Sequence, residues 1–108
     1  MNQDLARQIR TTYEKHGWSL RRILAVLSAP AQREEIAKAF PDTAITDAEI
    51  DALWFARRSP AGREAWELRL VAEQAYALFE AFEVDESEED REDARREMEN
   101  KMREYARG

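Results

Sequence analysis

The fold class is decided by residues 60–83, PAGREAWELRLVAEQAYALFEAFE. Seven apolar side chains recur there at the 3.6-residue spacing of a helix: Leu68, Val71, Ala72, Ala75, Leu78, Phe79 and Phe82. A second, narrower stripe follows the opposite side: Trp66, Leu70, Ala77 and Ala81. Because Pro60 needs no amide partner at a first helical position, the stretch predicts one long helix. A helix that is apolar on two sides packs between neighbours, so we expect it at the centre of the fold.

The chain before this stretch predicts four shorter helices, over about 3–16, 19–27, 30–40 and 46–58. Thr46 and Glu49 form a capping box at the best-marked of these starts. Four serines stand where a hydroxyl could accept from free first-turn amides, namely Ser19, Ser28, Ser59 and Ser87. The expected secondary structure is therefore helical throughout.

The chain from residue 84 onward differs sharply in composition. Between Glu83 and Asp93, eight of the eleven residues are acidic. A last helix over about 87–106 is predicted because acids gather at its start and bases at its end, which suits the helix dipole. Its apolar residues are few and share one face: Ala94, Met98, Met102 and Tyr105.

Together these patterns predict an all-α protein, a compact bundle of five to six helices. Residues 1–83 form the bundle around the long helix at 60–83. Residues 84–108 form an acidic, charge-rich C-terminal helix of the same single domain. This helix either packs on the bundle or serves a partner or dimer contact, and the sequence leaves both open.

Composition argues against most catalytic and metal chemistry. The 108 residues include no cysteine, one histidine and three glycines, too few for a zinc site or a phosphate-binding loop. His16 is expected to contact carbonyls at the end of the first helix. The acidic cluster lacks the glycine and the spacing of a calcium loop. We therefore expect no catalytic residue, no cofactor and no metal, and we do not expect an enzyme.

The same residues suggest where the protein works. No apolar run approaches the roughly 20 residues of a membrane span, and residues 1–7 lack the pattern of a secretion signal. A cytoplasmic location is the expectation. Abundant arginine and alanine are typical of a GC-rich bacterial or phage gene.

The leading functional hypothesis is a non-catalytic protein–protein interaction module, such as an adaptor, an inhibitor, or an immunity or chaperone-like factor. The net charge of −6 lies mostly in residues 83–108, which favours a basic partner. A homodimer through the C-terminal helix is a further expectation. The candidate partner-binding residues are Trp66, Leu70, Met98, Met102 and Tyr105, with Glu88, Glu89 and Asp90.

The alternative hypothesis is a DNA-binding transcriptional regulator. Residues 32–40 resemble the first helix of many helix-turn-helix motifs, which would make residues 46–58 the reading helix. The resemblance implies that Thr46, Arg57 and Arg58 face DNA. Against it, the predicted reader opens with acidic residues, and the chain has no broad basic surface to contact phosphates.

Overall fold

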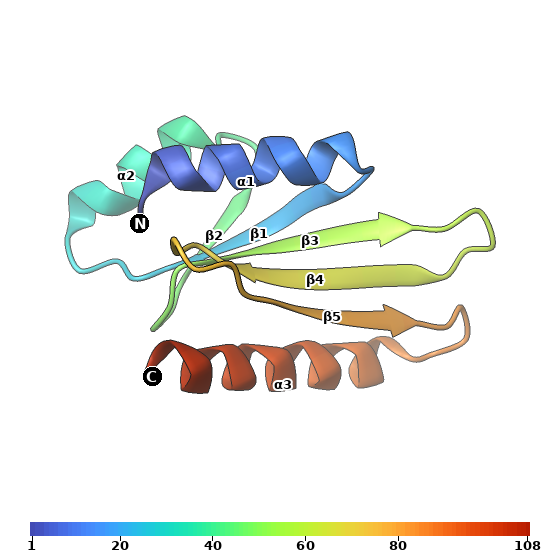
Figure 1. The fold of residues 1–108 in the computed structure, drawn as a ribbon. Coiled ribbons are helices and arrows are strands. Elements are labelled where there is room, and N and C mark those ends of the chain that lie inside the picture. Colours follow the sequence, from blue (N-terminus) through green and yellow to red (C-terminus); the bar gives the residue numbers. More distant parts are fainter.

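The middle of the chain forms a five-stranded sheet rather than helices, so the prediction of an all-α bundle is wrong (Figure 1). The computed structural model describes all of residues 1–108. The elements, in chain order, are α1 (Gln3–Lys15), β1 (Ser19–Ala25), α2 (Pro30–Ala39), β2 (Ala44–Asp47), β3 (Ala52–Arg58), β4 (Glu64–Leu70), β5 (Ala77–Phe82) and α3 (Glu88–Ala106).

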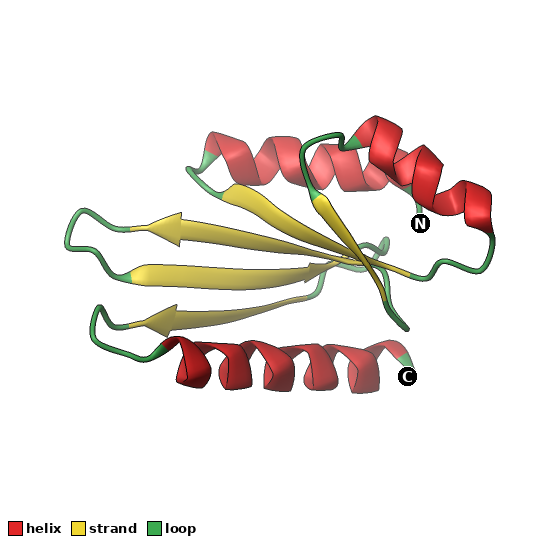
Figure 2. Ribbon diagram, turned by 180° about the vertical axis from the view of Figure 1, so that it is seen from behind, coloured by secondary structure: helices red, strands yellow, loops and turns green.

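The sheet has the strand order β2-β1-β3-β4-β5. β1 and β2 are parallel and α2 connects them, as parallel neighbours require a crossover connection. The other three pairs are antiparallel. Helices α1 and α2 cover one face of the sheet and α3 lies on the other (Figure 2). The fold is a three-layer α/β arrangement.

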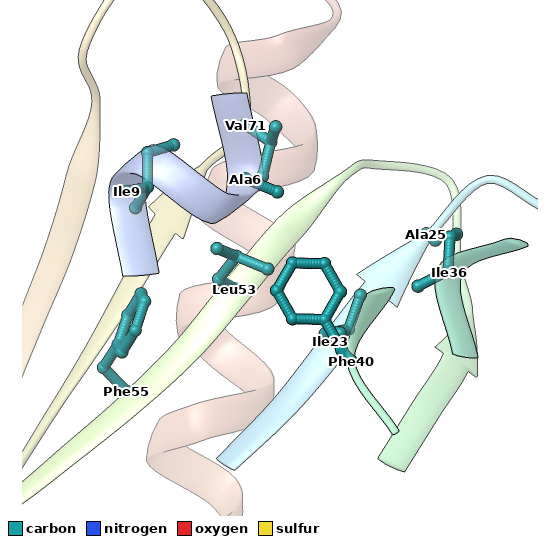
Figure 3. Close-up of a cluster of buried hydrophobic side chains, with 9 residues drawn as sticks. All are labelled: Ala6, Ile9, Ile23, Ala25, Ile36, Phe40, Leu53, Phe55 and Val71. Carbon is teal, nitrogen blue, oxygen red and sulfur yellow. The ribbon is translucent and has the colours of Figure 1, made fainter. Parts of the chain in front are cut away.

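The central strand β3 divides the core in two. Leu53 and Phe55 point to the face of α1 and α2, where Phe40 and Ile36 join them (Figure 3). Trp54 points to the face of α3. All residues from Ala52 to Ala56 are buried, because a strand covered on both faces needs apolar side chains in both directions.

Residues 60–83 form the β4–β5 hairpin, so the predicted long helix is wrong. In β4, Trp66, Leu68 and Leu70 alternate with polar residues and pack toward α3, which is the period of a strand. Gly62, with φ of +85°, closes the turn before β4. Ser59 caps no helix there, because its hydroxyl accepts from the Arg63 N–H at 3.2 Å within this turn.

The predicted helix at 19–27 is strand β1, interrupted by a bulge. Its register against β3 shifts between Leu20 and Arg22, so Arg21 is an extra residue. Leu20 and Ile23 consequently lie on the same face although they are three positions apart in the sequence. The bulge therefore produces a helix-like spacing in a strand.

The predicted helix at 46–58 is also wrong, because these residues belong to β2 and β3. Two acidic residues of the predicted reading helix instead bind the end of β1. An Asp51 carboxylate oxygen accepts from the Val26 N–H at 2.9 Å, and Asp47 accepts from the Leu27 N–H at 3.4 Å. With no second helix after α2, residues 32–58 do not form a helix-turn-helix motif.

Three predicted helices are confirmed, as α1, α2 and α3. The hydroxyl of Ser87 caps α3 by accepting from the Asp90 N–H at 3.1 Å, as its position predicts. At α2 the N-cap is Ala29 rather than Ser28, and the carboxamide of Gln32 accepts from the Ser28 N–H at 2.7 Å and the Ala29 N–H at 3.2 Å, just before the helix. The sequence pattern thus predicts the three helices but not the strands.

The two edges of the sheet differ. The edge strand β2 has four residues, and Arg33 of α2 donates to its Ile45 carbonyl at 3.1 Å. The edge strand β5 has six residues and pairs only with β4. Phe79, in the middle of β5, is 55% exposed. One edge is therefore covered by a side chain and the other is open.

Candidate functional site

The candidate site is a groove of about 450 Å³ between the bulged strand β1 and helix α3. We call it the arginine groove. Charged side chains form most of its wall, and two indole rings complete it. Its residues are Arg21, Arg22, Trp54, Trp66, Glu92, Arg95, Arg96 and Glu99.

The bulge brings two guanidinium groups into this groove. Arg22 lies opposite Trp54 in the β1–β3 register, so its side chain shares the α3 face with that indole. Arg21, the extra residue, places its guanidinium carbon 5.8 Å from the centre of the Trp66 ring. A regular strand would send these neighbours to opposite faces.

Helix α3 supplies the opposite wall. The guanidinium carbon of Arg95 lies 4.7 Å from the Trp66 ring centre, within the range of a cation–π contact. Arg95 also pairs with Glu88. The Trp54 indole N–H donates to Glu99 at 2.9 Å. The two tryptophans therefore hold α3 and the sheet together beneath the groove.

A partly buried carboxylate fixes the position of Trp66. Glu64 accepts from the Trp66 indole N–H at 2.6 Å and pairs with Arg91 of α3 at 3.3 Å. The indole hydrogen bond, and then the charges of Arg91, Arg58 and Arg21, hold the pKa of Glu64 below its ordinary value of 4.5, although partial burial acts in the opposite direction. Glu64 thus stays ionised in the folded protein at neutral pH.

The charge balance of the groove is opposite to that of the chain. Four guanidinium groups face two carboxylates in the groove, whereas the whole chain carries −6. Arg95 and Arg96 have carboxylate partners on their own helix. Arg21 and Arg22 form neither an ion pair nor a hydrogen bond with a carboxylate, and both are exposed. Their donors are free to bind an anionic ligand.

The apolar residues that the sequence assigns to a partner surface pack against one another. Met98 and Met102 of α3 are buried against a cluster that includes Leu70, with Trp66 at its margin. Tyr105 stacks on Tyr76, with ring centres 3.6 Å apart, and remains 36% exposed. Helix α3 therefore covers the stripe that we considered for a partner.

The charged residues singled out from the sequence are spread over the surface. Glu88, Glu89 and Asp90 form the exposed first turn of α3. Thr46 lies on β2, at the other edge of the sheet from β5. Arg57 donates to the His16 carbonyl at 3.1 Å, and Arg58 pairs with Glu64 at 3.7 Å. Thr46 and the two arginines are thus not gathered on one element.

His16 lies at the end of α1, where its Nδ1 is 2.9 Å from the Thr12 carbonyl, as expected from the sequence. No group of three histidine, aspartate or glutamate side chains is arranged to hold a metal ion. None of the helices is long and apolar enough to cross a lipid bilayer.

Sequence reasoning missed the groove because it placed Arg21 and Arg22 on a helix. The pair Arg21-Arg22 between the apolar residues Leu20 and Ile23 was the available signal, since a bulged strand shows this spacing too. Comparisons of the chain with protein-family models, with curated proteins and with solved structures found no match.

Proposed function

We propose that this protein is a non-catalytic protein–protein interaction module that binds a short acidic segment of its partner in the arginine groove. The observation that carries the proposal is the pair of exposed guanidinium groups of Arg21 and Arg22, which have no ion-pair partner and are set side by side by the bulge. Guanidinium groups bind carboxylates through two parallel hydrogen bonds.

The surroundings of this pair favour a peptide over a nucleic acid. Trp54 and Trp66 give the groove an apolar wall, which suits a peptide with apolar residues between its acids. Glu92 and Glu99 lie in the same groove and would oppose a continuous row of phosphates. The net charge of −6 also repels a long polyanion, whereas a short segment senses mainly charges within the Debye length of about 8 Å.

The groove does not use the acidic residues at the start of α3. Glu89 and Asp90 are exposed and stay available to a basic partner, as the sequence suggests, whereas Glu88 already pairs with Arg95. The proposal rests on the groove because a concave site with unpartnered donors selects a ligand more sharply than an exposed helix turn does.

A charge-reversal pair tests the proposal. The probe is a fluorescent oligoglutamate peptide containing one leucine, titrated at low salt and followed by anisotropy. The variant Arg22→Glu with Arg96→Glu should weaken binding at least about tenfold, because it replaces attraction by repulsion at two sites.

The matched control is Arg7→Glu with Lys38→Glu, which changes the net charge by the same amount on the face of α1 and α2. It should leave binding within about twofold of the parent. Equal losses in the two variants would reduce the effect to bulk charge and overturn the proposal. Binding of duplex DNA in preference to the peptide would overturn it in favour of a nucleic-acid ligand.

A further inference from the structure

The free edge of β5 presents a row of unpaired peptide groups. The Leu70 N–H donates to the Tyr76 carbonyl at 2.9 Å, and the antiparallel register continues without a shift to Glu64 opposite Phe82. Hydrogen-bonded pairs alternate along such a ladder, so the even-numbered residues of β5 bond to β4. The N–H and C=O groups of Ala77, Phe79 and Ala81 therefore point away from the sheet.

This edge lacks most of the features that normally prevent pairing with another strand, and its one charged side chain is Glu80. It contains no proline, no lysine and no bulge, which are the usual protections of an edge strand. Its central side chain, Phe79, is 55% exposed. At the other edge Arg33 donates a hydrogen bond to the Ile45 carbonyl of β2.

We propose that β5 pairs with β5 of a second copy of this chain, antiparallel and related by a two-fold axis perpendicular to the sheet. Two such registers give the greatest overlap over Ala77–Phe82. One centres on Phe79 facing Phe79 of the second copy, and the other centres on Glu80 facing Glu80. Directly opposed like charges are destabilising, so the register centred on Phe79 is the one assigned.

The chosen register is self-complementary along its length. Ala77 faces Ala81 of the second copy, which leaves space beside the central aromatic pair. On the opposite face of the strand, Leu78 faces Glu80, so no two charges of the same sign meet. Aromatic pairs directly across two strands are among the stabilising cross-strand contacts.

Phe79 is already held in place within one copy. The Trp18 ring packs edge-on against it, with ring centres 6.3 Å apart at 84°. Tyr13 in turn contacts Trp18 edge-on at 6.1 Å and stacks on Phe55 at 4.1 Å. This row of rings connects the edge to the core and lowers the entropy lost when Phe79 is buried by a second copy.

The geometry fixes where the two arginine grooves lie. A two-fold axis perpendicular to the sheet keeps both α3 faces on the same side, so both grooves open on one side of the pair. The contact itself is one strand pair, smaller than the roughly 1,600 Å² of a standard interface. We therefore expect a weak dimer that forms at high protein concentration and dissociates on dilution.

Cysteine pairing tests the register, because the chain has no cysteine of its own. Hydrogen-bonded antiparallel pairs have Cα atoms about 5.5 Å apart, within reach of a disulfide. Ala77→Cys and Ala81→Cys chains carrying different tags should form a mixed disulfide under mild oxidation, and each alone should form little. Glu80→Cys alone should also form little, since it crosslinks efficiently only in the competing register.

The overturning results are distinct. Efficient self-crosslinking of Glu80→Cys would show that the register centred on Glu80 forms instead. The interface would be refuted if the Ala77→Cys and Ala81→Cys mixture formed no more disulfide than Ala44→Cys, a control on β2. The yield of mixed disulfide should be unchanged in chains that also carry Arg22→Glu and Arg96→Glu. Loss of dimerisation can therefore be distinguished from loss of peptide binding in the arginine groove.

Sedimentation velocity gives a second measurement without cysteines. The parent chain should shift from monomer toward dimer as concentration rises, and Phe79→Lys should remain monomeric. Circular dichroism checks that Phe79→Lys is folded, as expected for a solvent-exposed site. A parent chain that stays monomeric at its solubility limit, or a Phe79→Lys chain that still dimerises, would contradict the proposal.

Discussion

The two edges of the sheet belong to one domain but end in opposite ways. At β2 the strand is short, and a guanidinium group of α2 bonds to an outward carbonyl. At β5 the outward peptide groups of Ala77, Phe79 and Ala81 have no partner, and the ring of Phe79 is exposed. The same sheet thus has one edge blocked by a side chain and one that can accept another strand.

This difference shows how the helices define the surface of the sheet. Helix α2 lies beside β2 and can reach its edge with Arg33. Helix α3 contacts β4 and β5 on one face, and its long side chains, including Arg91 and Arg95, turn inward to Glu64 and Trp66. Unlike the Ile45 carbonyl of β2, the carbonyls of Ala77, Phe79 and Ala81 accept no hydrogen bond from a side chain.

The largest effect is expected when the support beneath β4 is removed. Met102 is fully buried between α3 and the sheet, so Met102→Ala should lower the free energy of unfolding by about 2–5 kcal/mol. Urea unfolding followed by circular dichroism measures this. Met102→Leu, which keeps the volume, should lose less than about 1.5 kcal/mol. Equal midpoints for Met102→Ala and the parent would show that α3 does not stabilise this half of the sheet.

A smaller effect is expected when the blocked edge is opened. Arg33→Ala removes the bond to the Ile45 carbonyl and should cost about 0.5–1.5 kcal/mol. It should also increase association at high protein concentration, because a second edge becomes available. Lys38→Ala on the same helix is the control. Light scattering that is identical for the two variants would mean that Arg33 does not protect the edge.

The smallest effect concerns the carboxylate that joins β4 to α3. Because the pKa of Glu64 is lowered in the folded state, its contribution to stability is complete above its ordinary value of 4.5 and is lost as the pH falls below it. Between about pH 6 and pH 3, Glu64→Gln should therefore lose less stability than the parent. Glu92→Gln, at an exposed site, should follow the parent. Parallel curves for Glu64→Gln and the parent would rule out this contribution.

The three helices were predictable because the sequence features that mark them involve neighbouring residues only. The spacing of Leu5, Ile9 and Tyr13 and the serine before α3 depend only on neighbouring residues. Helix α2 carries a proline at its start, which has the same local character. These features act within one turn, so the sequence alone predicts the helices that contain them.

The sheet was not predictable in the same way because long-range contacts override local preference there. Residues 52–56 are uniformly apolar, and periodicity alone cannot separate a buried strand from a buried helix. In 66–70, the alternation of Trp66, Leu68 and Leu70 with charged residues was a strand signal that the overlapping helical spacing obscured. Only pairing with β3 and β5 decides between them.

The candidate site was partly visible in the sequence. Trp66 and Leu70 were grouped with Met98 and Met102, and the structure brings these residues together inside the protein. The arginine groove was not visible, because it depends on a register shift between β1 and β3. Such a shift concerns the relation of two strands, and neither strand encodes it alone.

The bulge in β1 has a consequence for how this surface can change over evolutionary time. Deletion of Arg21 would restore an unbroken register, with Leu20 opposite Phe55 and Arg22 opposite Trp54 as they already are. Loss of this single codon would therefore remove a positive charge from the groove while the apolar contacts of β1 stay paired. The charge of the arginine groove can therefore change through the deletion of one residue, without any substitution in the core.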